Sequence, residues 1–310
     1  MSENINNRNY SRIREDHSGR FNDVNSVEVI QAKQKIVLIE LFKNLLSILE
    51  KNHLRYWMCG GSMLGTVRHQ GIIPWDDDID IFMPREDYER FLDMAETTQL
   101  SPYKVVSPRN GFYSAFAKFC DDRTTIWESK YYPYLLGVYI DIFPLDYSND
   151  DVNVILKHKK RIRHLHHMYR LCFCTQPLIV FLKKRYYLGF ISKLLFSNKY
   201  SIRHRLNVFN KVVKKSSSSE GWAIVSWTQY PNKVFHSEWF AQSVEMQFEG
   251  IQVQIPKGYH EFLSLVYGDY MKLPPIEDRK SNHPSLYKNF DKKLLFDEVL
   301  ERVKIGIHEE

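Results

Sequence analysis

The spacing of hydrophobic residues predicts a chain of alternating helices and strands. From residue 26 to 53, apolar side chains recur near the helical period and polar residues fill the opposite face, which predicts an amphipathic helix. Residues 78–82 alternate acidic with apolar side chains, which predicts a strand. Further strands are expected at residues 55–59, 103–107, 115–120, 124–128, 137–143 and 222–227, with a hairpin over 244–255 that turns at Glu249-Gly250.

Capping residues and prolines mark where these elements begin and end. Ser62 stands at the N-cap position of a short helix over residues 62–68. Pro84 opens a helix that runs to about Glu96. Pro144 is expected to end the strand before it, because proline cannot donate a ladder hydrogen bond. Further helices are expected at residues 259–267 and, two or three of them, between 152 and 215.

The composition is that of a folded protein without a disulfide framework. The chain has 310 residues, of which 44% are hydrophobic and 14% aromatic, so it can bury a large core and is not intrinsically disordered. Its four cysteines, Cys59, Cys120, Cys172 and Cys174, fit a reduced, cytosolic protein. Cys172 and Cys174 lack a second Cys/His pair with zinc spacing, so we interpret them as buried apolar residues.

Neither end of the chain suggests export or membrane insertion. Residues 1–25 are polar and lack the apolar core of a signal peptide, and we interpret them as a disordered tail. No run of 18 apolar residues occurs in the sequence. The expected location is therefore the cytoplasm, with peripheral attachment to the inner face of the cytoplasmic membrane as a further expectation.

That attachment is suggested by a segment of one charge sign. Residues 152–219 contain 16 Lys or Arg and no Asp or Glu, although the whole chain carries a net charge of only +6. Such a segment favours an anionic partner, and an anionic membrane surface is the first candidate. A purely structural cover over the sheet stays open as an alternative, and nucleic acid is unlikely. His164, His166 and His167 are interpreted as part of the same cationic face.

The chemistry of the chain is indicated first by paired carboxylates. Asp78 and Asp80 stand two apart in the predicted strand, so their side chains project to the same side. Two carboxylates that close repel each other unless a cation lies between them, and oxygen ligands of this kind suit Mg²⁺ or Mn²⁺. Asp141, a lone acid in a hydrophobic strand, is expected to be a third ligand, and a buried structural aspartate is the alternative.

A second feature, upstream of these acids, suits phosphate. Gly60-Gly61-Ser62 precedes a helix start, where backbone N–H groups can bind a phosphate and glycine allows close approach. Arg68 and His69 lie one or two turns further on and are candidate phosphate contacts. Lys118 is another, on a strand of apolar neighbours. A surface role is the alternative for both Arg68 and Lys118.

Together these stretches resemble the LicD family. The resemblance rests on Gly60-Gly-Ser-Met-Leu-Gly-Thr-Val-Arg-His69, Ile73-Pro-Trp-Asp-Asp-Asp-Ile-Asp-Ile81, Tyr139-Ile-Asp-Ile-Phe-Pro-Leu-Asp146 and Tyr267-Gly-Asp-Tyr-Met-Lys-Leu-Pro-Pro275. It implies an α+β, nucleotidyltransferase-like fold, with a mixed sheet flanked by helices. The additional basic helical segment carries no motif of the family, and it divides the chain into a catalytic core at 26–150, the basic segment at 151–219, and strands and a helix at 220–310 that complete the core.

The resemblance also implies an activity and roles for residues. Members of the family are similar in moving a phosphoalcohol from a CDP-linked donor to a cell-surface glycan, which can be lipid-linked. Asp78 and Asp80 match the metal-binding pair and Asp141 the third acid, while Asp76 and Asp77 match the acidic run without an assigned role. His283, after the last motif, is a candidate contact for acceptor or phosphate. The alternatives are nucleotide transfer from an NTP to RNA or protein, and an inert phosphoglycan-binding module.

Overall fold

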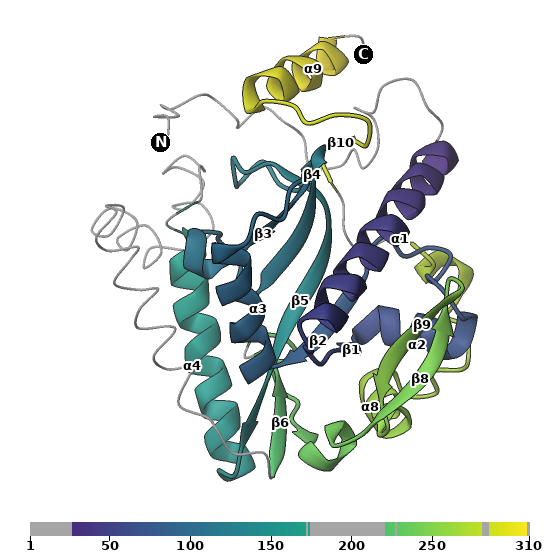
Figure 1. The fold of residues 1–310 in the computed structure, drawn as a ribbon, viewed down its shortest axis with the longest axis vertical. Helices are drawn as coiled ribbons and strands as arrows, with labels where there is room; N and C mark the ends of the chain where they lie inside the picture. Colours follow the sequence, from purple (N-terminus) through teal and green to yellow (C-terminus); the bar gives the residue numbers. More distant parts are fainter. Residues whose placement is uncertain (1–26, 172, 174–220, 227, 281–284, 309–310) are drawn as a thin grey trace.

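A computed structural model describes residues 27–171, 173, 221–226, 228–280 and 285–308 of the chain. Their helices lie around a large curled mixed sheet, and a separate hairpin lies beside the sheet (Figure 1). The predicted α+β class is therefore confirmed. The predicted tail at residues 1–25 lies outside the described residues, as do His283, Cys172 and Cys174.

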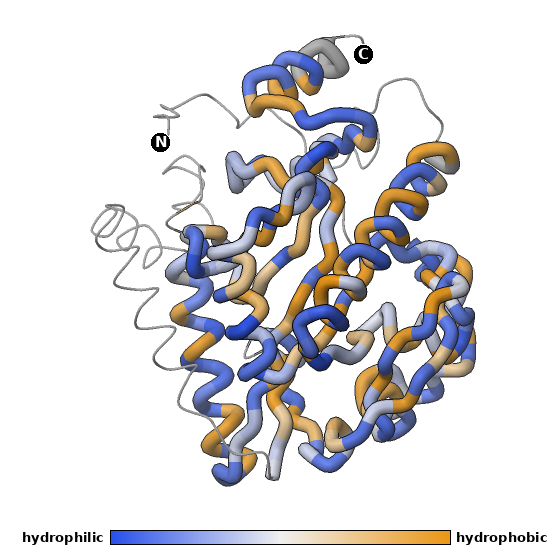
Figure 2. Tube along the Cα trace, in the orientation of Figure 1, coloured by the Kyte–Doolittle hydropathy of each residue, from blue (hydrophilic) through white to orange (hydrophobic). Residues whose placement is uncertain are grey.

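The helices agree closely with the hydrophobic pattern. Figure 2 shows hydrophilic and hydrophobic residues alternating along α1 and α4, as expected for helices with one buried face. The α-helices are α1 (Val27–Lys51), α2 (Gly60–His69), α3 (Arg85–Thr97), α4 (Val152–Leu171), α8 (Tyr259–Tyr267) and α9 (Phe296–His308). Short 3₁₀ turns are η2 (Pro108–Asn110), η3 (Ser237–Phe240) and η4 (Ile276–Asp278).

One long strand organises the sheet. The central path is β1 (Trp57–Met58), β2 (Asp80–Pro84), β5 (Leu136–Ser148), β4 (Ala117–Trp127) and β10 (Tyr287–Asn289). Outside this path, β3 (Tyr103–Val106) pairs with β4, β6 (Trp222–Val225) pairs with β5, and β7 (Phe235–His236) pairs with β6. The β2–β5 pair is parallel and the other pairs are antiparallel. As a result β5 touches three neighbours along its length.

The prediction that Pro144 ends its strand was wrong. β5 continues through Pro144 to Ser148. Its pairing with β4 reaches only as far as Ile142, and its pairing with β6 begins at Leu145. On this edge of β5, Pro144 therefore lies where β4 has ended and β6 has not begun, so its missing N–H leaves no ladder partner unsatisfied. On the other edge it is the register partner of Met83 in β2. Its carbonyl still accepts a hydrogen bond from the Ser226 N–H at 2.8 Å.

The two strands predicted at 115–120 and 124–128 are a single strand, β4, with a change of register inside it. Between Asp121 and Ile126 the pairing with β5 shifts, and the Thr124 hydroxyl replaces a ladder partner. That hydroxyl donates to the Asp121 carbonyl at 2.9 Å and accepts from the Val138 N–H at 2.7 Å. The polar stretch that breaks the hydrophobic pattern is thus a bulge rather than a turn.

The C-terminal part of the chain packs onto the sheet beyond β2. The predicted hairpin is β8 (Ser243–Phe248) and β9 (Ile251–Pro256), and it turns at Glu249 and Gly250, both with positive φ, as expected. Phe262 of α8 packs edge-on to Phe82 of β2, with ring centroids 5.7 Å apart. This contact brings residues 180 positions apart in sequence into one core.

Helix α4 begins the basic segment and covers the side of β6 that faces away from the main core. Ile155 and Ile162 pack with Ile224 of β6, whereas the next residue, Val225, points into the main core. The remainder of the segment lies outside the described residues. None of the helices that the structure describes has the length and apolarity to cross a membrane.

The assignment of all three histidines of α4 to a cationic face was wrong for His166. His164 and His167 are exposed, but His166 is partly buried against the sheet, and its Nε2 lies 3.2 Å from the Tyr113 carbonyl oxygen. Burial, together with the nearby Arg170 and His167 charges, lowers the pKa of His166 to about 4. The imidazole is therefore neutral at physiological pH.

This environment predicts a pH-dependent stability. The folded chain protonates His166 only near pH 4, whereas an unfolded chain does so near 6.5. The stabilisation that the folded state gains by keeping His166 neutral is complete above about pH 6.5 and is lost as the pH falls toward 4. Between pH 7 and 5 the free energy of unfolding should therefore fall by on the order of 2 kcal/mol. His166→Gln should flatten the fall in melting temperature over this range. His164→Gln, on the exposed side of α4, should leave it unchanged, and equal slopes in wild type and His166→Gln would contradict the assignment.

Candidate functional site

The register of the sheet places two acids and a lysine in one row. Asp80 of β2 is the Cα partner of Asp141 in β5, and Lys118 of β4 is the partner of Asp141 on its other side. Directly paired residues project from the same face of a sheet. Three charged side chains, from positions 80, 118 and 141, therefore stand next to one another across three strands.

The lysine of this row is buried and fully engaged. Lys118 Nζ lies 2.7 Å from Asp141 Oδ1 and 3.5 Å from Glu128 Oε1, and 3.4 Å above the centre of the Tyr139 ring. Burial alone would lower the pKa of Lys118, but the two carboxylates outweigh it and raise the pKa. Glu128 also accepts hydrogen bonds from the hydroxyls of Tyr139, at 2.5 Å, and Tyr113, at 2.9 Å. Lys118 is therefore a fixed counter-charge for Asp141.

Asp80 occupies the most strongly charged position. Its Oδ1 is buried and has no hydrogen-bond partner among the described residues. Burial raises the pKa of Asp80 well above its usual value, and the charges of Asp78, Asp141 and Asp76 raise it further, while Lys118 lowers it. A carboxylate in this position is stable in its charged form only if further positive charge is brought to it.

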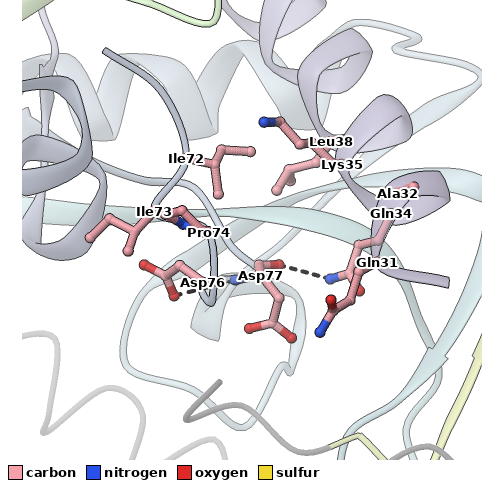
Figure 3. A pocket seen from close by; sticks show the side chains of 10 residues that line it. All are labelled: Gln31, Ala32, Gln34, Lys35, Leu38, Ile72, Ile73, Pro74, Asp76 and Asp77. Carbon is pink, nitrogen blue, oxygen red and sulfur yellow. Dashed lines mark hydrogen bonds between the residues drawn. The ribbon is translucent and has the colours of Figure 1, made fainter. Parts of the chain in front are cut away.

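The loop before β2 carries the other acids, and one of them is held by a lysine from the far end of the chain. Lys288 Nζ of β10 lies 3.1 Å from Asp77 Oδ2 and 2.9 Å from Gln34 Oε1 of α1. The Gln34 amide in turn donates to the Asp77 carbonyl at 2.7 Å (Figure 3). Asp77 thus fixes the loop against α1 and β10, whereas Asp76 and Asp78 contribute to the field at Asp80.

A cavity of about 250 Å³ opens between this loop and α1 (Figure 3). Its polar wall includes Gln31, Gln34 and Lys35, and its apolar wall includes Leu38, Ile72 and Ile73. Asp76 and Asp77 lie at its edge. The cavity therefore adjoins the acidic loop but is separate from the row of Asp80, Asp141 and Lys118.

The start of α2 meets the same row. Gly60 has φ +47°, and a Cβ built there would lie 3.2 Å from the Tyr230 hydroxyl, 3.7 Å from the Tyr267 hydroxyl and 3.8 Å from Asp80 Oδ2. A Cβ on Gly61 would lie 2.7 Å from Asp76 Oδ2. At both glycines the backbone, without a side chain, therefore lies close to carboxylate and hydroxyl groups. The site is a helix start, where the first N–H groups have no partner within the helix.

The prediction that Ser62 is the N-cap was wrong. α2 begins at Gly60 after Cys59, which caps it without a side-chain hydrogen bond. Ser62 is buried inside the first turn, and its hydroxyl accepts the Asp80 N–H at 2.9 Å. The Cys59 N–H donates to the Asp80 carbonyl, also at 2.9 Å. Ser62 and Cys59 at the start of α2 therefore hydrogen-bond to both the N–H and the carbonyl of Asp80 and fix the position of its carboxylate.

Two of the predicted phosphate contacts lie at the opposite end of α2. Arg68 Nη1 donates to the Tyr270 carbonyl at 2.7 Å, and His69 meets the edge of the Trp75 ring. Arg68 lies eight positions after Gly60 along α2, a rise of about 12 Å. In this structure Arg68 holds the segment after α8, and it is not brought together with the start of the helix.

Several groups at the site could not be found by reading motifs. Lys288 and Gln34 lie in stretches without a chemical signature, and Tyr230 lies in the turn after β6, which ends at Val225. Glu128 gave one weak signal, as the acid that ends a hydrophobic strand. Their roles depend on contacts between distant parts of the chain, and no local spacing shows such contacts.

The residues present suit a divalent cation in chemistry. The orphaned Oδ1 of Asp80 and the surrounding carboxylates supply hard oxygen ligands, which Mg²⁺ and Mn²⁺ prefer. In the described part of the chain, no three His, Cys, Asp or Glu side chains already stand arranged around a common point as a metal site. The acids would therefore have to adjust their side-chain rotamers to share one ion.

Comparison with known proteins gives a match over the part of the chain that carries this site. Residues 53–178 match the model of the LicD/FKTN/FKRP nucleotidyltransferase domain. The chain is 29% identical over 257 residues to the lipopolysaccharide cholinephosphotransferase LicD of Haemophilus influenzae, a match that covers 81% of this chain and 95% of that protein.

A more distant relative matches over a short stretch. The ribitol 5-phosphate transferase FKRP of mouse is 46% identical over 50 residues, which cover 16% of this chain and 10% of that protein. Both characterised relatives are transferases. The matched domain contains Asp76, Asp78, Asp80, Lys118 and Asp141. In its fold, its row of acids and its glycine-led helix, the chain is similar to the LicD transferase, and its residues 53–178 match the LicD/FKTN/FKRP nucleotidyltransferase domain.

Proposed function

We propose that the chain transfers a phosphoalcohol from a CDP-linked donor to a cell-surface glycan. In this reaction a glycan hydroxyl oxygen forms a bond to the donor phosphorus that carries the alcohol. The bond from that phosphorus to the bridging oxygen breaks, and CMP leaves with the oxygen. The hydroxyl proton passes to a base or to solvent, and the product is a phosphodiester on the glycan.

The observation that carries this proposal is the position of the Asp80–Asp141 pair beside the start of α2. The sheet register brings the two carboxylates together, and Gly60 presents bare backbone within reach of Asp80. A diphosphate needs both partners at once, because its charge requires N–H donors on one side and cations on the other.

Asp78, Asp80 and Asp141 would hold Mg²⁺ or Mn²⁺, with Asp76 as a further candidate. When bound there, such an ion neutralises charge on the donor diphosphate and on the departing CMP. Asp77 is the weakest candidate ligand, because Lys288 and Gln34 already engage it.

The protein's own groups would do the rest. Backbone N–H groups at Gly60 and Gly61 orient a phosphate, and the hydroxyls of Tyr230 and Tyr267 lie close enough to Gly60 to add donors. Asp141, held beside Lys118, either completes the ligand set or accepts the proton of the acceptor hydroxyl. Lys118 keeps Asp141 oriented in both cases and is a positioning residue rather than a phosphate contact.

The choice of acceptor follows the H. influenzae relative, which is named for its action on lipopolysaccharide. We infer a surface glycan of this class, such as lipopolysaccharide, capsule or teichoic acid, reached from an anionic membrane surface to which residues 152–219 attach. A competing function is nucleotide transfer, because the matched family model is described as a nucleotidyltransferase domain. It would release pyrophosphate from an NTP instead of CMP from a CDP-linked donor.

Activity should identify the donor and test the acids together. Purified protein with Mg²⁺ should release CMP from one of CDP-choline, CDP-glycerol or CDP-ribitol in the presence of acceptor, and no pyrophosphate from NTPs. EDTA should abolish release. Asp78→Ala or Asp80→Ala should lower the rate about a thousandfold, or about 4 kcal/mol in activation free energy. Either variant within tenfold of wild type would refute the site, and pyrophosphate release would favour nucleotide transfer.

Stability should separate a functional Asp80 from a structural one. Asp80→Asn relieves repulsion within the acidic cluster, so the metal-free melting temperature should stay level or rise, while the increase caused by Mg²⁺ should disappear. Asp146→Asn is the control, because Asp146 is a buried aspartate that is fully paired: it accepts two hydrogen bonds of 2.7 Å from Arg85. It should lose about 3 kcal/mol of stability. A similar loss in Asp80→Asn would make Asp80 structural.

Replacing Lys118 should have the opposite effect on metal-free stability and on the Mg²⁺-dependent rise in melting temperature to replacing Asp80. Lys118→Met removes the counter-charge of Asp141, so the metal-free protein should lose about 3 kcal/mol of stability. Mg²⁺ should then raise the melting temperature by more than in wild type, because the ion restores the missing charge.

The control for this variant is Lys159→Met. Lys159 is equally buried but donates to the Gln229 carbonyl at 3.0 Å, away from the acids. Lys159→Met should lower the melting temperature of the metal-free protein without changing the rise in melting temperature that Mg²⁺ causes. An unchanged increment in Lys118→Met would contradict the proposed role.

A further inference from the structure

Most of the exposed apolar side chains gather in one segment. Among the described residues, nine large hydrophobic side chains are exposed, and five of them lie between residues 265 and 276: Leu265, Tyr267, Met271, Leu273 and Ile276. Ile276 is 78% exposed and Met271 56%. We call residues 265–276 the apolar rim. Exposed apolar groups that cluster in this way mark a surface that binds something.

The apolar rim is held in place by its backbone. Arg68 donates to the Tyr270 carbonyl at 2.7 Å, Arg279 to the Pro274 carbonyl at 3.0 Å, and Lys233 to the Leu265 carbonyl. The Tyr270 ring is buried, and its hydroxyl lies 3.0 Å from His260 Nδ1. Three cations and one buried ring thus fix the main chain, while the side chains of Leu265, Met271, Leu273 and Ile276 are exposed. The exposure is a property of the folded structure rather than of a loose loop.

The apolar rim also borders the functional site. Tyr267 belongs to it, and its hydroxyl lies beside Gly60 and Asp80. α8, which leads into the rim, packs against α2 (Figure 1). Whatever binds this surface is therefore brought to the edge of the acids.

We propose that the apolar rim inserts into the surface of a lipid bilayer and holds the site over the glycans attached to it. This inference rests on the proposed function, since only a lipid-linked acceptor places a bilayer within reach of the acids. Leu273 and Ile276 beside the exposed Lys272 and Lys280 suit the boundary between acyl chains and headgroups.

The charges of the chain support a bilayer as the occupant. Residues 265–280 contain three basic and three acidic side chains, so the rim contributes apolar insertion without net attraction. The attraction comes from residues 152–219 with their 16 Lys or Arg. Stable attachment of a protein without a spanning helix needs two signals of this kind, one apolar and one electrostatic.

Vesicle co-sedimentation of the full chain tests the proposal. The triple variant Met271→Ser, Leu273→Ser, Ile276→Ser should have an affinity for vesicles of phosphatidylcholine and phosphatidylglycerol that is at least about tenfold lower than that of wild type. The matched control is Val29→Ser, Ile36→Ser, Leu295→Ser, which removes three equally exposed apolar groups on α1 and before α9. It should bind as wild type does.

Three results would overturn the proposal. The rim variant could bind as well as wild type, wild type could bind no vesicles, or sedimentation velocity could show a dimer that the rim variant dissociates. CMP release with a short soluble acceptor separates this proposal from the reaction, because the rim variant should retain it. Vesicle binding without CMP release from any donor would refute the proposed function and leave the bilayer contact standing.

Discussion

Repulsion between carboxylates is the constraint on which the rest of this structure depends. The register of β2 and β5 places Asp80 directly beside Asp141, and the loop before β2 adds Asp76 and Asp78 to the same field. Left alone, such a group would take up protons or push the strands apart. The fold counters it with Lys118 next to Asp141 and with Lys288 next to Asp77. Each lysine neutralises one acid and leaves the charge of the others concentrated around Asp80.

The counter-charges come from parts of the chain that share no local sequence. Lys118 lies on β4 and Lys288 on β10, while the hydroxyls near Gly60 come from Tyr230 and Tyr267. The acids therefore reach their arrangement only when the sheet is complete from β2 to β10. Part of the C-terminal third joins the core of β2 through Phe262, whereas β10 and α9 form a separate cluster with Trp127 of β4.

The sequence predicts the elements well where one periodicity dominates. α8 and the β8–β9 hairpin match expectation almost to the residue, and α1 matches within two. It fails where a tertiary contact replaces a local rule, since Pro144 is tolerated between two strand partners and Thr124 bridges a bulge with its hydroxyl. Asp80 and Asp141 could be chosen from their apolar surroundings. The burial of Lys118 against Asp141 could not, because the register that pairs them depends on that bulge and on the length of β5.

The pairing of β5 with β6 has one more consequence, for the modularity of the chain. Ser148, at the end of β5, is the register partner of Trp222, at the start of β6. The 73 residues between them, which include the whole basic segment, therefore leave and rejoin the sheet at neighbouring positions. β5 and β6 are thus the strands of an antiparallel hairpin with a very long connection, and replacing this connection with a short turn would keep both strands in register. Related chains could thus lengthen, shorten or exchange this connection while the row of acids on β2 and β5 stays the same.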